Sequence, residues 1–310
     1  MNLAPIVLFV YNRPQHMRQT VDALQKNILA PDSDLIIYAD GPKDGEMTDS
    51  ILEVRAYIKN ISGFKSVKII EQEKNKGLAP SVIAGVREVV NEYGKIIVIE
   101  DDVLSSPYFL NFMNESLEIY EQDRKVLSIG SWNYHYRKRR SDKDFFFLRL
   151  PDTIAWATWK NRWDLFEEDT SLLKEKIIKA NLQQYFDLDG YFEYMRMLEE
   201  QIQGMSSSWC IRWTAVAALN KTLTVYPTIS LTKHIGYDAL GTHCDSFDWN
   251  KKLKMSKRKL NVFADLAKET PQCLKSRQHF YDVTLMDNVL ALLKKMLPTR
   301  LKLLLKKLLA

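Results

Sequence analysis

The sequence contains little cysteine, and its cysteines are not spaced as in a metal ribbon. Only three occur in 310 residues, Cys210, Cys244 and Cys273, and no two of them form a C-x-x-C pair. This spacing argues against both a zinc ribbon and a framework of disulfides. A reducing, cytoplasmic setting is therefore the expectation.

Long hydrophobic runs and a strong excess of one charge are also missing. No run approaches the roughly 20 apolar residues that span a bilayer. The first run, "IVLFV", is only five residues long, follows no basic segment and is expected to be a strand rather than a signal peptide. A net charge of +5 gives little support to nucleic-acid binding. What remains, 46% hydrophobic and 27% charged residues, is a normal globular composition.

The pattern of the chain divides it into three stretches. Residues 1–135 alternate helical patterns with short apolar runs such as "PIVLFVY", "DLIIYAD", "SVKIIEQ" and "KIIVIEDD". This alternation predicts an α/β fold of βαβ units, with a mostly parallel sheet and helices on both faces. Residues 136–250 are less regular and rich in aromatic residues, and we expect them to complete a cleft. Residues 251–310 contain a basic linker, a helical pattern and a Leu/Lys tail.

Three adjacent carboxylates, Glu100, Asp101 and Asp102, follow the apolar run "KIIVI". Solvent contact, or capping of the helix that follows, could account for them simply. However, like charges this close raise each other's pKa and destabilise the fold. A divalent cation would relieve the repulsion, and carboxylate oxygens suit Mg²⁺ or Mn²⁺. Because ligands bind at the carboxyl ends of parallel strands, the sequence predicts a metal site there.

The order of "EDD" with "NRP", "DG", "NKGL", "SWxIRW" and "GTHC", from about residue 4 to residue 245, resembles GT-A glycosyltransferases. The pattern is similar to that of bacterial surface-polysaccharide sugar transferases, and in turn to the eukaryotic N-acetylglucosaminyltransferase of complex N-glycan synthesis. The resemblance implies a Rossmann-like GT-A domain with residues 1–135 as its nucleotide-sugar half and 136–250 as its acceptor half. It further implies inverting transfer to a lipopolysaccharide or capsule glycan, with a UDP-sugar as the expected donor and Mn²⁺ or Mg²⁺ as the cofactor.

The resemblance also implies roles for single residues of the first half. Asp102 would bind the metal, and Glu100 and Asp101 would face the sugar or the ribose. The other positions implied in donor binding are Arg13 near the nucleotide or phosphates, Asp40 on the imide N–H of uracil, and Lys76 with Asn75 and Gly77 at a phosphate-binding helix start. Simpler alternatives remain, because Arg13 could only bridge strand and helix, and the segments at Asp40 and Lys76 have good turn chemistry.

Five tryptophans of the second half stand three or four residues apart within two groups. Trp156, Trp159 and Trp163 have the spacing of one helical face, and Trp209 and Trp213 repeat the spacing of four. Such a stripe is either part of the core or, for Trp156 and Trp209, the floor of an acceptor site on which a sugar ring stacks.

The catalytic base is the least defined part of the predicted site. Inverting transfer needs a base for the acceptor hydroxyl, and family members often have an acidic residue two places before the tryptophan of "SWxIRW", where this chain has Ser207. Asp238 and Asp189 are the remaining acidic candidates, and Asp238 is favoured because its Gly-rich surroundings resemble a family loop near the donor. His243 is expected to bind the donor by contacting the metal and diphosphate, and His234 is the second choice for this contact. Either histidine could instead form hydrogen bonds in the core.

Two other functions stay open from the sequence. Ser207 at the position of the base is compatible with an inactive carbohydrate-binding relative. A sugar nucleotidyltransferase would also use a Rossmann-like sheet with acidic metal ligands, but the chain has no Gly-rich phosphate loop.

The last twenty residues, "ALLKKMLPTRLKLLLKKLLA", contain six basic residues and no acidic one. Leucines and lysines after Pro298 fall on different faces of a helix, which predicts binding to an anionic membrane surface and thus a peripheral position on the inner face of the cell membrane. The alternative is a helix that packs on the catalytic domain or on a second subunit.

Overall fold

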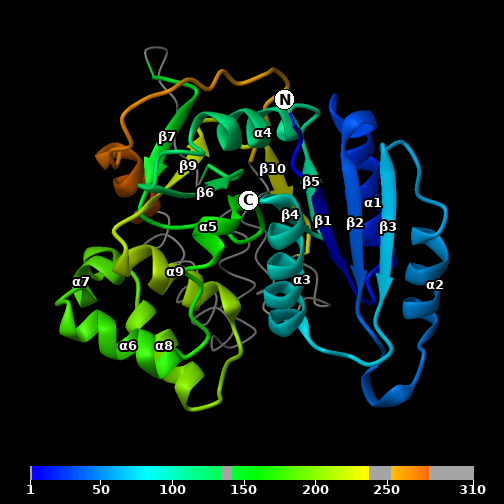
Figure 1. Cartoon of the computed structure of the whole chain (residues 1–310), viewed down its shortest axis with the longest axis horizontal. Helices are drawn as coiled ribbons and strands as arrows, with labels where there is room; N and C mark the ends of the chain where they lie inside the picture. The colour runs from blue at the N-terminus through cyan, green and yellow to red at the C-terminus, as the bar shows by residue number, and fades with distance from the viewer. Residues whose placement is uncertain (1, 134–141, 237–252, 279–310) are drawn as a thin grey trace, which may run out of the picture.

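The computed structural model describes residues 2–133, 142–236 and 253–278, and its centre is one mixed sheet (Figure 1). The strand order is β3-β2-β1-β4-β8-β6-β9-β7. These strands are β1 (Ile6–Val10), β2 (Asp34–Ala39), β3 (Ser66–Glu71), β4 (Lys95–Glu100), β6 (Val126–Gly130), β7 (Phe145–Leu148), β8 (Ala155–Trp159) and β9 (Leu223–Pro227). A separate pair, β5 (Val103–Ser105) and β10 (Thr232–His234), forms a small antiparallel sheet.

Most strands of the large sheet run in one direction, which confirms the predicted α/β class. β3, β2, β1 and β4 are parallel neighbours, and β6 is parallel to β9. β8 is antiparallel to β4 and β6, and β7 is antiparallel to β9. The aromatic-rich second stretch therefore extends the sheet of the first stretch, with its strand β8 next to β4.

Helices cover both faces of the sheet. Their bounds are α1 (Pro14–Gln25), α2 (Asp49–Ile58), α3 (Leu78–Tyr93), α4 (Phe109–Ile119), α5 (Lys160–Trp163), α6 (Thr170–Lys179), α7 (Gln183–Phe186), α8 (Tyr194–Ile202) and α9 (Trp209–Leu219). Alternate residues of β1 point to opposite faces: Val7 and Phe9 pack in a core with α3 and α9, whereas Ile6 and Leu8 pack in a second core with α1 and α4. The two cores together fix the positions of β1 and of its neighbours in the sheet.

The C-terminal described segment lies against the outer strand β7. Residues 253–270 form no helix or strand, and the backbone N–H of Thr270 donates to the carbonyl of Phe147 at 3.0 Å. The Tyr120 hydroxyl donates to the Phe263 carbonyl at 2.9 Å. Residues 271–278 are helical, and the predicted membrane-binding tail lies outside the described residues. Within the three described ranges, no helix has the length and apolar character needed to cross a membrane.

Candidate active site

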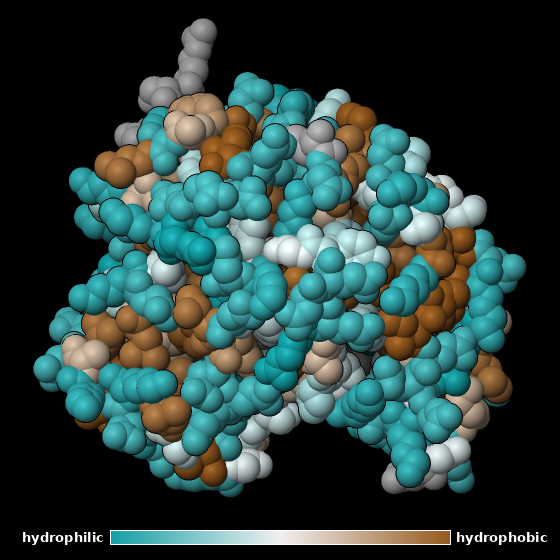
Figure 2. All heavy atoms as spheres, viewed as in Figure 1, coloured by the Kyte–Doolittle hydropathy of each residue, from teal (hydrophilic) through white to brown (hydrophobic). Residues whose placement is uncertain are grey.

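The acidic turn, residues 100–102, begins where β4 ends and leads into β5. Thr20 of α1 fixes this turn, because its buried hydroxyl donates to the carbonyl of Asp101 at 2.8 Å and accepts from the N–H of Val103 at 3.1 Å. The parallel strands point their carboxyl ends toward the lower edge of Figure 1, and Figure 2 shows the molecular surface hollowed at that edge. The turn is thus held at the edge where a ligand is expected.

Asp102 is buried between two basic side chains. Arg13, directly before α1, donates from Nη1 to Oδ2 at 2.5 Å, and His234 Nε2 lies 3.2 Å from Oδ1. His234 reaches this position because it ends β10 and pairs with Val103 of β5. Burial alone would raise the pKa of Asp102, but the nearby His234 and Arg13 outweigh it and lower the pKa. Asp102 is therefore held as a carboxylate.

The residues of the turn fit a divalent metal ion. Glu100, Asp102 and His234 each offer one ligand atom, and these atoms lie within 4.8 Å of one another. Oδ1 of Asp102 is buried and, apart from the contact with His234, has no hydrogen-bond partner within the described part of the chain. The two carboxylates suit Mn²⁺ or Mg²⁺. This ligand set confirms the sequence prediction of a divalent metal cofactor.

The other two carboxyl groups of the turn have a raised pKa when no cation is near. Burial, followed by the charges of Asp102 and Asp101, raises the pKa of Glu100 well above its usual range. Burial and the charge of Asp102 raise the pKa of Asp101 to about 7. A cation would lower both values by relieving the repulsion that the sequence indicated.

Asp40 connects the end of β2 to the start of α3. Its carboxylate accepts from the backbone N–H groups of Gly41 at 2.8 Å, Lys76 at 2.9 Å and Gly77 at 3.0 Å. Gly77 has φ +78° and is the N-cap of α3, and Asn75 Nδ2 donates to the Gly41 carbonyl at 2.9 Å. These contacts support the turn alternative. A carboxylate accepts about four hydrogen bonds, so contact with a nucleotide base stays a prediction for Asp40, as does phosphate contact for Lys76.

The first turn of α9 lies near the acidic turn. Burial raises the pKa of the Cys210 thiol to about 12, and the charge of Glu100 contributes to this rise, so the two side chains are near each other. Ser207 lies just before the helix, and its catalytic role stays a prediction. Asp238 and His243 lie outside the described residues. Asp189 forms an ion pair with Arg149 at 3.2 Å.

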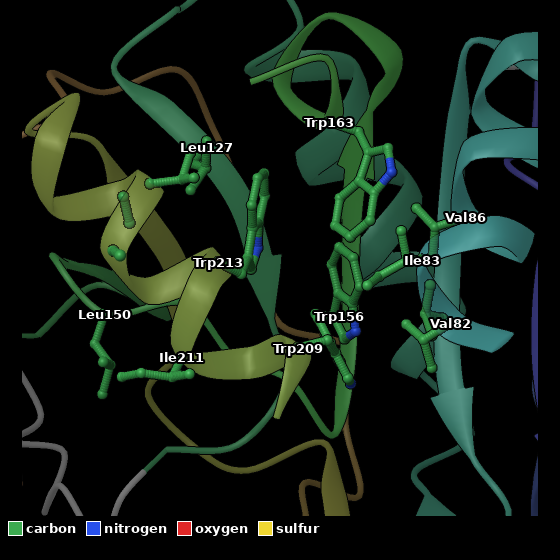
Figure 3. Close-up of a cluster of buried hydrophobic side chains, with 14 of the residues drawn as sticks. Val82, Ile83, Val86, Leu127, Leu150, Trp156, Trp163, Trp209, Ile211 and Trp213 are labelled. Carbon is green, nitrogen blue, oxygen red and sulfur yellow. The ribbon is translucent and has the colours of Figure 1, made fainter. Parts of the chain in front are cut away.

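The predicted helical stripe of Trp156, Trp159 and Trp163 is wrong, because Trp156 and Trp159 lie on β8 and only Trp163 lies on α5. Trp156 stacks on Trp209 with ring centroids 5.3 Å apart, and both are buried (Figure 3). Figure 3 also shows Val82, Ile83 and Val86 of α3 beside them. This burial supports the core alternative, and an acceptor-binding role for Trp156 and Trp209 stays a prediction.

Sequence reasoning left two contributions to the site undefined. It favoured His243, which lies outside the described residues, over His234, which lies at the acidic turn, because the antiparallel pairing of β5 with β10 carries no local sequence signal. It also missed Thr20, which lies within an ordinary helical pattern. The signal that identifies Thr20 is a threonine residue that is 0% exposed, and this signal exists only in the folded chain.

Comparisons with known proteins identify the family. The family model described as "Glycosyl transferase family 2" matches residues 6–182. No curated protein sequence matches the chain.

Solved structures of glycosyltransferases are similar to this chain at low sequence identity. The mannosyltransferase PcManGT from Pyrobaculum calidifontis, in complex with GDP-Man and Mn²⁺, is 12% identical with a TM-score of 0.39, over 70% of this chain and 69% of its own. GalNAc-T7 with UDP, GalNAc and Mn²⁺ is 11% identical with a TM-score of 0.45, over 75% of this chain and 43% of its own. TarS from S. aureus is 12% identical with a TM-score of 0.40, over 73% and 37%. The chain thus matches less than half the length of the last two.

Proposed function

The chain belongs to glycosyl transferase family 2 and is a glycosyltransferase, and from this premise we propose that it transfers a sugar from a UDP-sugar to a growing bacterial surface glycan, with inversion at the anomeric carbon. The observation that carries the proposal is the group of Glu100, Asp102 and His234 at the carboxyl edge of the parallel strands. This is the edge where ligands of such sheets bind.

The residues around this group have separate tasks in the proposed reaction. Asp102, Glu100 and His234 would hold the metal, which when bound offsets the charge of the diphosphate leaving group. The loop anchored by Asp40 holds Lys76 and the start of α3 at the same edge, where they would bind the donor. A base near the first turn of α9 or in the segment of Asp238 would take the proton of the acceptor hydroxyl.

The acceptor is proposed to be a glycan carried on a membrane lipid. The support is the basic, leucine-rich composition of residues 291–310, which would hold the enzyme on an anionic leaflet beside such an acceptor. Removal of residues 291–310 should release the protein from anionic liposomes and spare transfer to a soluble acceptor analogue. Co-sedimentation that is unchanged by the deletion would contradict the membrane part of the proposal.

A donor screen tests the central part of the proposal. The full chain is incubated with Mn²⁺ and UDP-, GDP- or CMP-sugars, and the released nucleotide is measured with and without a glycan acceptor. We expect release from a UDP-sugar, and a loss of at least about 100-fold in Asp102→Asn, because the substitution removes the charge of a metal ligand.

Asp164→Asn is the matched control, because Asp164 is an exposed aspartate whose carboxylate pairs with Lys160, four residues earlier. Its turnover should equal that of the wild type. Wild-type turnover in Asp102→Asn, with the fold intact by circular dichroism, would contradict the metal assignment. Donor binding without any turnover would favour the carbohydrate-binding alternative.

A further inference from the structure

The two oxygens of the Asp102 carboxylate have different surroundings. Oδ2 accepts from Arg13 Nη1 at 2.5 Å, and the two side chains are only 15% and 7% exposed. Oδ1 lies 3.2 Å from His234 Nε2 and has no further hydrogen-bond partner in the ranges that the structure describes. One oxygen is thus fixed by a guanidinium, while the other lies beside His234, which is a further candidate metal ligand.

Gly236 provides the space for this arrangement. A Cβ atom at this position would overlap Asp102 Oδ2 and would lie 2.9 Å from Arg13 Nη2. The backbone cannot move away freely, because the N–H of the preceding Ile235 donates to the Asp102 carbonyl at 2.8 Å. Only glycine allows the chain to pass the ion pair at this distance.

We propose that Arg13 is a positioning residue for the metal ion, which holds Asp102 by Oδ2 so that Oδ1 faces Glu100 and His234, and that Gly236 keeps the room this ion pair needs. The inference deepens the proposed function and rests on it. A carboxylate whose second oxygen is bound by a guanidinium cannot rotate away from the ion. Outer partners of this kind typically contribute 10- to 100-fold to metal affinity.

Two other roles for Arg13 make different predictions. If the guanidinium only competed with the metal for the charge of Asp102, its removal would strengthen metal binding. If Arg13 acted only on the donor phosphates, as the family resemblance implies, its removal would leave metal binding without nucleotide unchanged. Metal affinity in the absence of any nucleotide therefore separates the three roles.

The experiment measures the binding of Mn²⁺ alone to the full chain by electron paramagnetic resonance. We expect Arg13→Met to weaken binding by about 10- to 100-fold. Arg13→Lys keeps the charge but lacks the planar donor group, so its affinity should lie between those of the wild type and Arg13→Met. Arg18→Met is the matched control, because Arg18 lies on the adjoining helix α1, is more exposed and pairs with Glu53 at 2.9 Å. Its Mn²⁺ affinity should be that of the wild type.

Gly236→Ala tests the same pair from the other side. We expect it to weaken Mn²⁺ binding to a similar degree. The double variant with Arg13→Met should bind Mn²⁺ no more weakly than the weaker-binding single variant, since both substitutions break one contact. Thermal melting of each variant shows whether the fold is retained.

The outcomes separate this inference from the proposed function. Wild-type Mn²⁺ binding that requires Asp102 but is unchanged or tighter in Arg13→Met would overturn the inference alone. A wild-type chain that binds no Mn²⁺ would overturn the proposed function and the inference with it.

Discussion

The acidic turn and the tryptophan cluster (Trp156, Trp163, Trp209 and Trp213) are neighbours with opposite physical character. Val98 of β4 pairs with Trp156 of β8, and two residues further on β4 ends at Glu100. In the cluster, apolar rings pack with centroids 5.0 to 6.4 Å apart and carry no charge. In the turn, three carboxyl groups crowd together, and the pKa of two of them is raised.

Stability and chemistry are thus separated over a few residues of one strand pair. Burial of the rings stabilises the fold, whereas burial of like charges costs stability unless a cation is bound. Substitutions in the cluster should therefore change unfolding, and substitutions in the turn should change metal and donor binding. Four predictions test this contrast.

Trp156→Ala should cause the largest loss of stability, about 3 to 5 kcal/mol, because it leaves a cavity beneath Trp209 and beside α3. Urea unfolding of the full chain measures the loss. Trp156→Phe is the matched control. It keeps an aromatic ring and removes an indole N–H that has no hydrogen-bond partner in the described structure, so it should cost far less. Equal losses in the two variants would contradict a packing role for the ring.

Asp40→Ala should lower the free energy of unfolding by about 2 kcal/mol, because three backbone N–H groups lose a charged acceptor. It should also weaken nucleotide binding more than it slows the chemical step, as measured by calorimetry and turnover. Asp40→Asn retains one acceptor oxygen and should lose less of both. Full stability in Asp40→Ala would show that the turn does not depend on these bonds.

The metal-free chain should become less stable as the pH rises from about 4 to about 7. Asp101 has a pKa of about 7 in the folded chain and an ordinary value of 3.8. Between these two values the folded state keeps a proton that the unfolded state has lost, so a rise in pH favours unfolding. Because the side chain is partly exposed, the change should be about 1 to 2 kcal/mol. Unfolding curves in EDTA at several pH values measure it. Asp101→Asn should flatten this dependence of stability on pH, and Asp164→Asn should leave it unchanged. A flat profile in the wild type would contradict the raised pKa of Asp101.

Ser207→Ala should have the smallest effect, a loss of less than about 10-fold in turnover, because a serine hydroxyl is a poor base near neutral pH. Asp238→Asn should lower turnover more. Steady-state kinetics with both variants compares them, and the reverse order would show that Ser207 takes part in proton transfer.

Sequence patterns predicted the first half of the fold well because its elements are local. Short apolar runs with β-branched residues became β1, β2, β3 and β4, and Gly77 became the N-cap that "NKGL" indicated. The prediction that Asp102 lies among possible metal ligands rested on a local signal in the same way, because three adjacent carboxylates directly after a buried strand repel one another unless a cation is bound.

The second half could not be predicted in the same way because its structure depends on distant contacts. "AWATW" has apolar residues at spacings that suit a helix, yet it forms β8 because β4 and β6 offer backbone partners on both sides. The pairing of Arg13 with Asp102 and the approach of His234 arise from tertiary packing alone, and no spacing in the sequence indicates them.

The position of β8 also sets an order for folding during synthesis. β4 and β6 emerge from the ribosome before β8, yet they are not neighbours in the sheet and each pairs with β8. Until residues 155–159 are synthesised, one edge of β4 is unpaired and β6 has no strand that links it to β4. An N-terminal fragment that ends at residue 135 would therefore expose strand edges that are prone to aggregation. We therefore expect the complete sheet to form only after β8 has been synthesised, because β8 links β4 to β6.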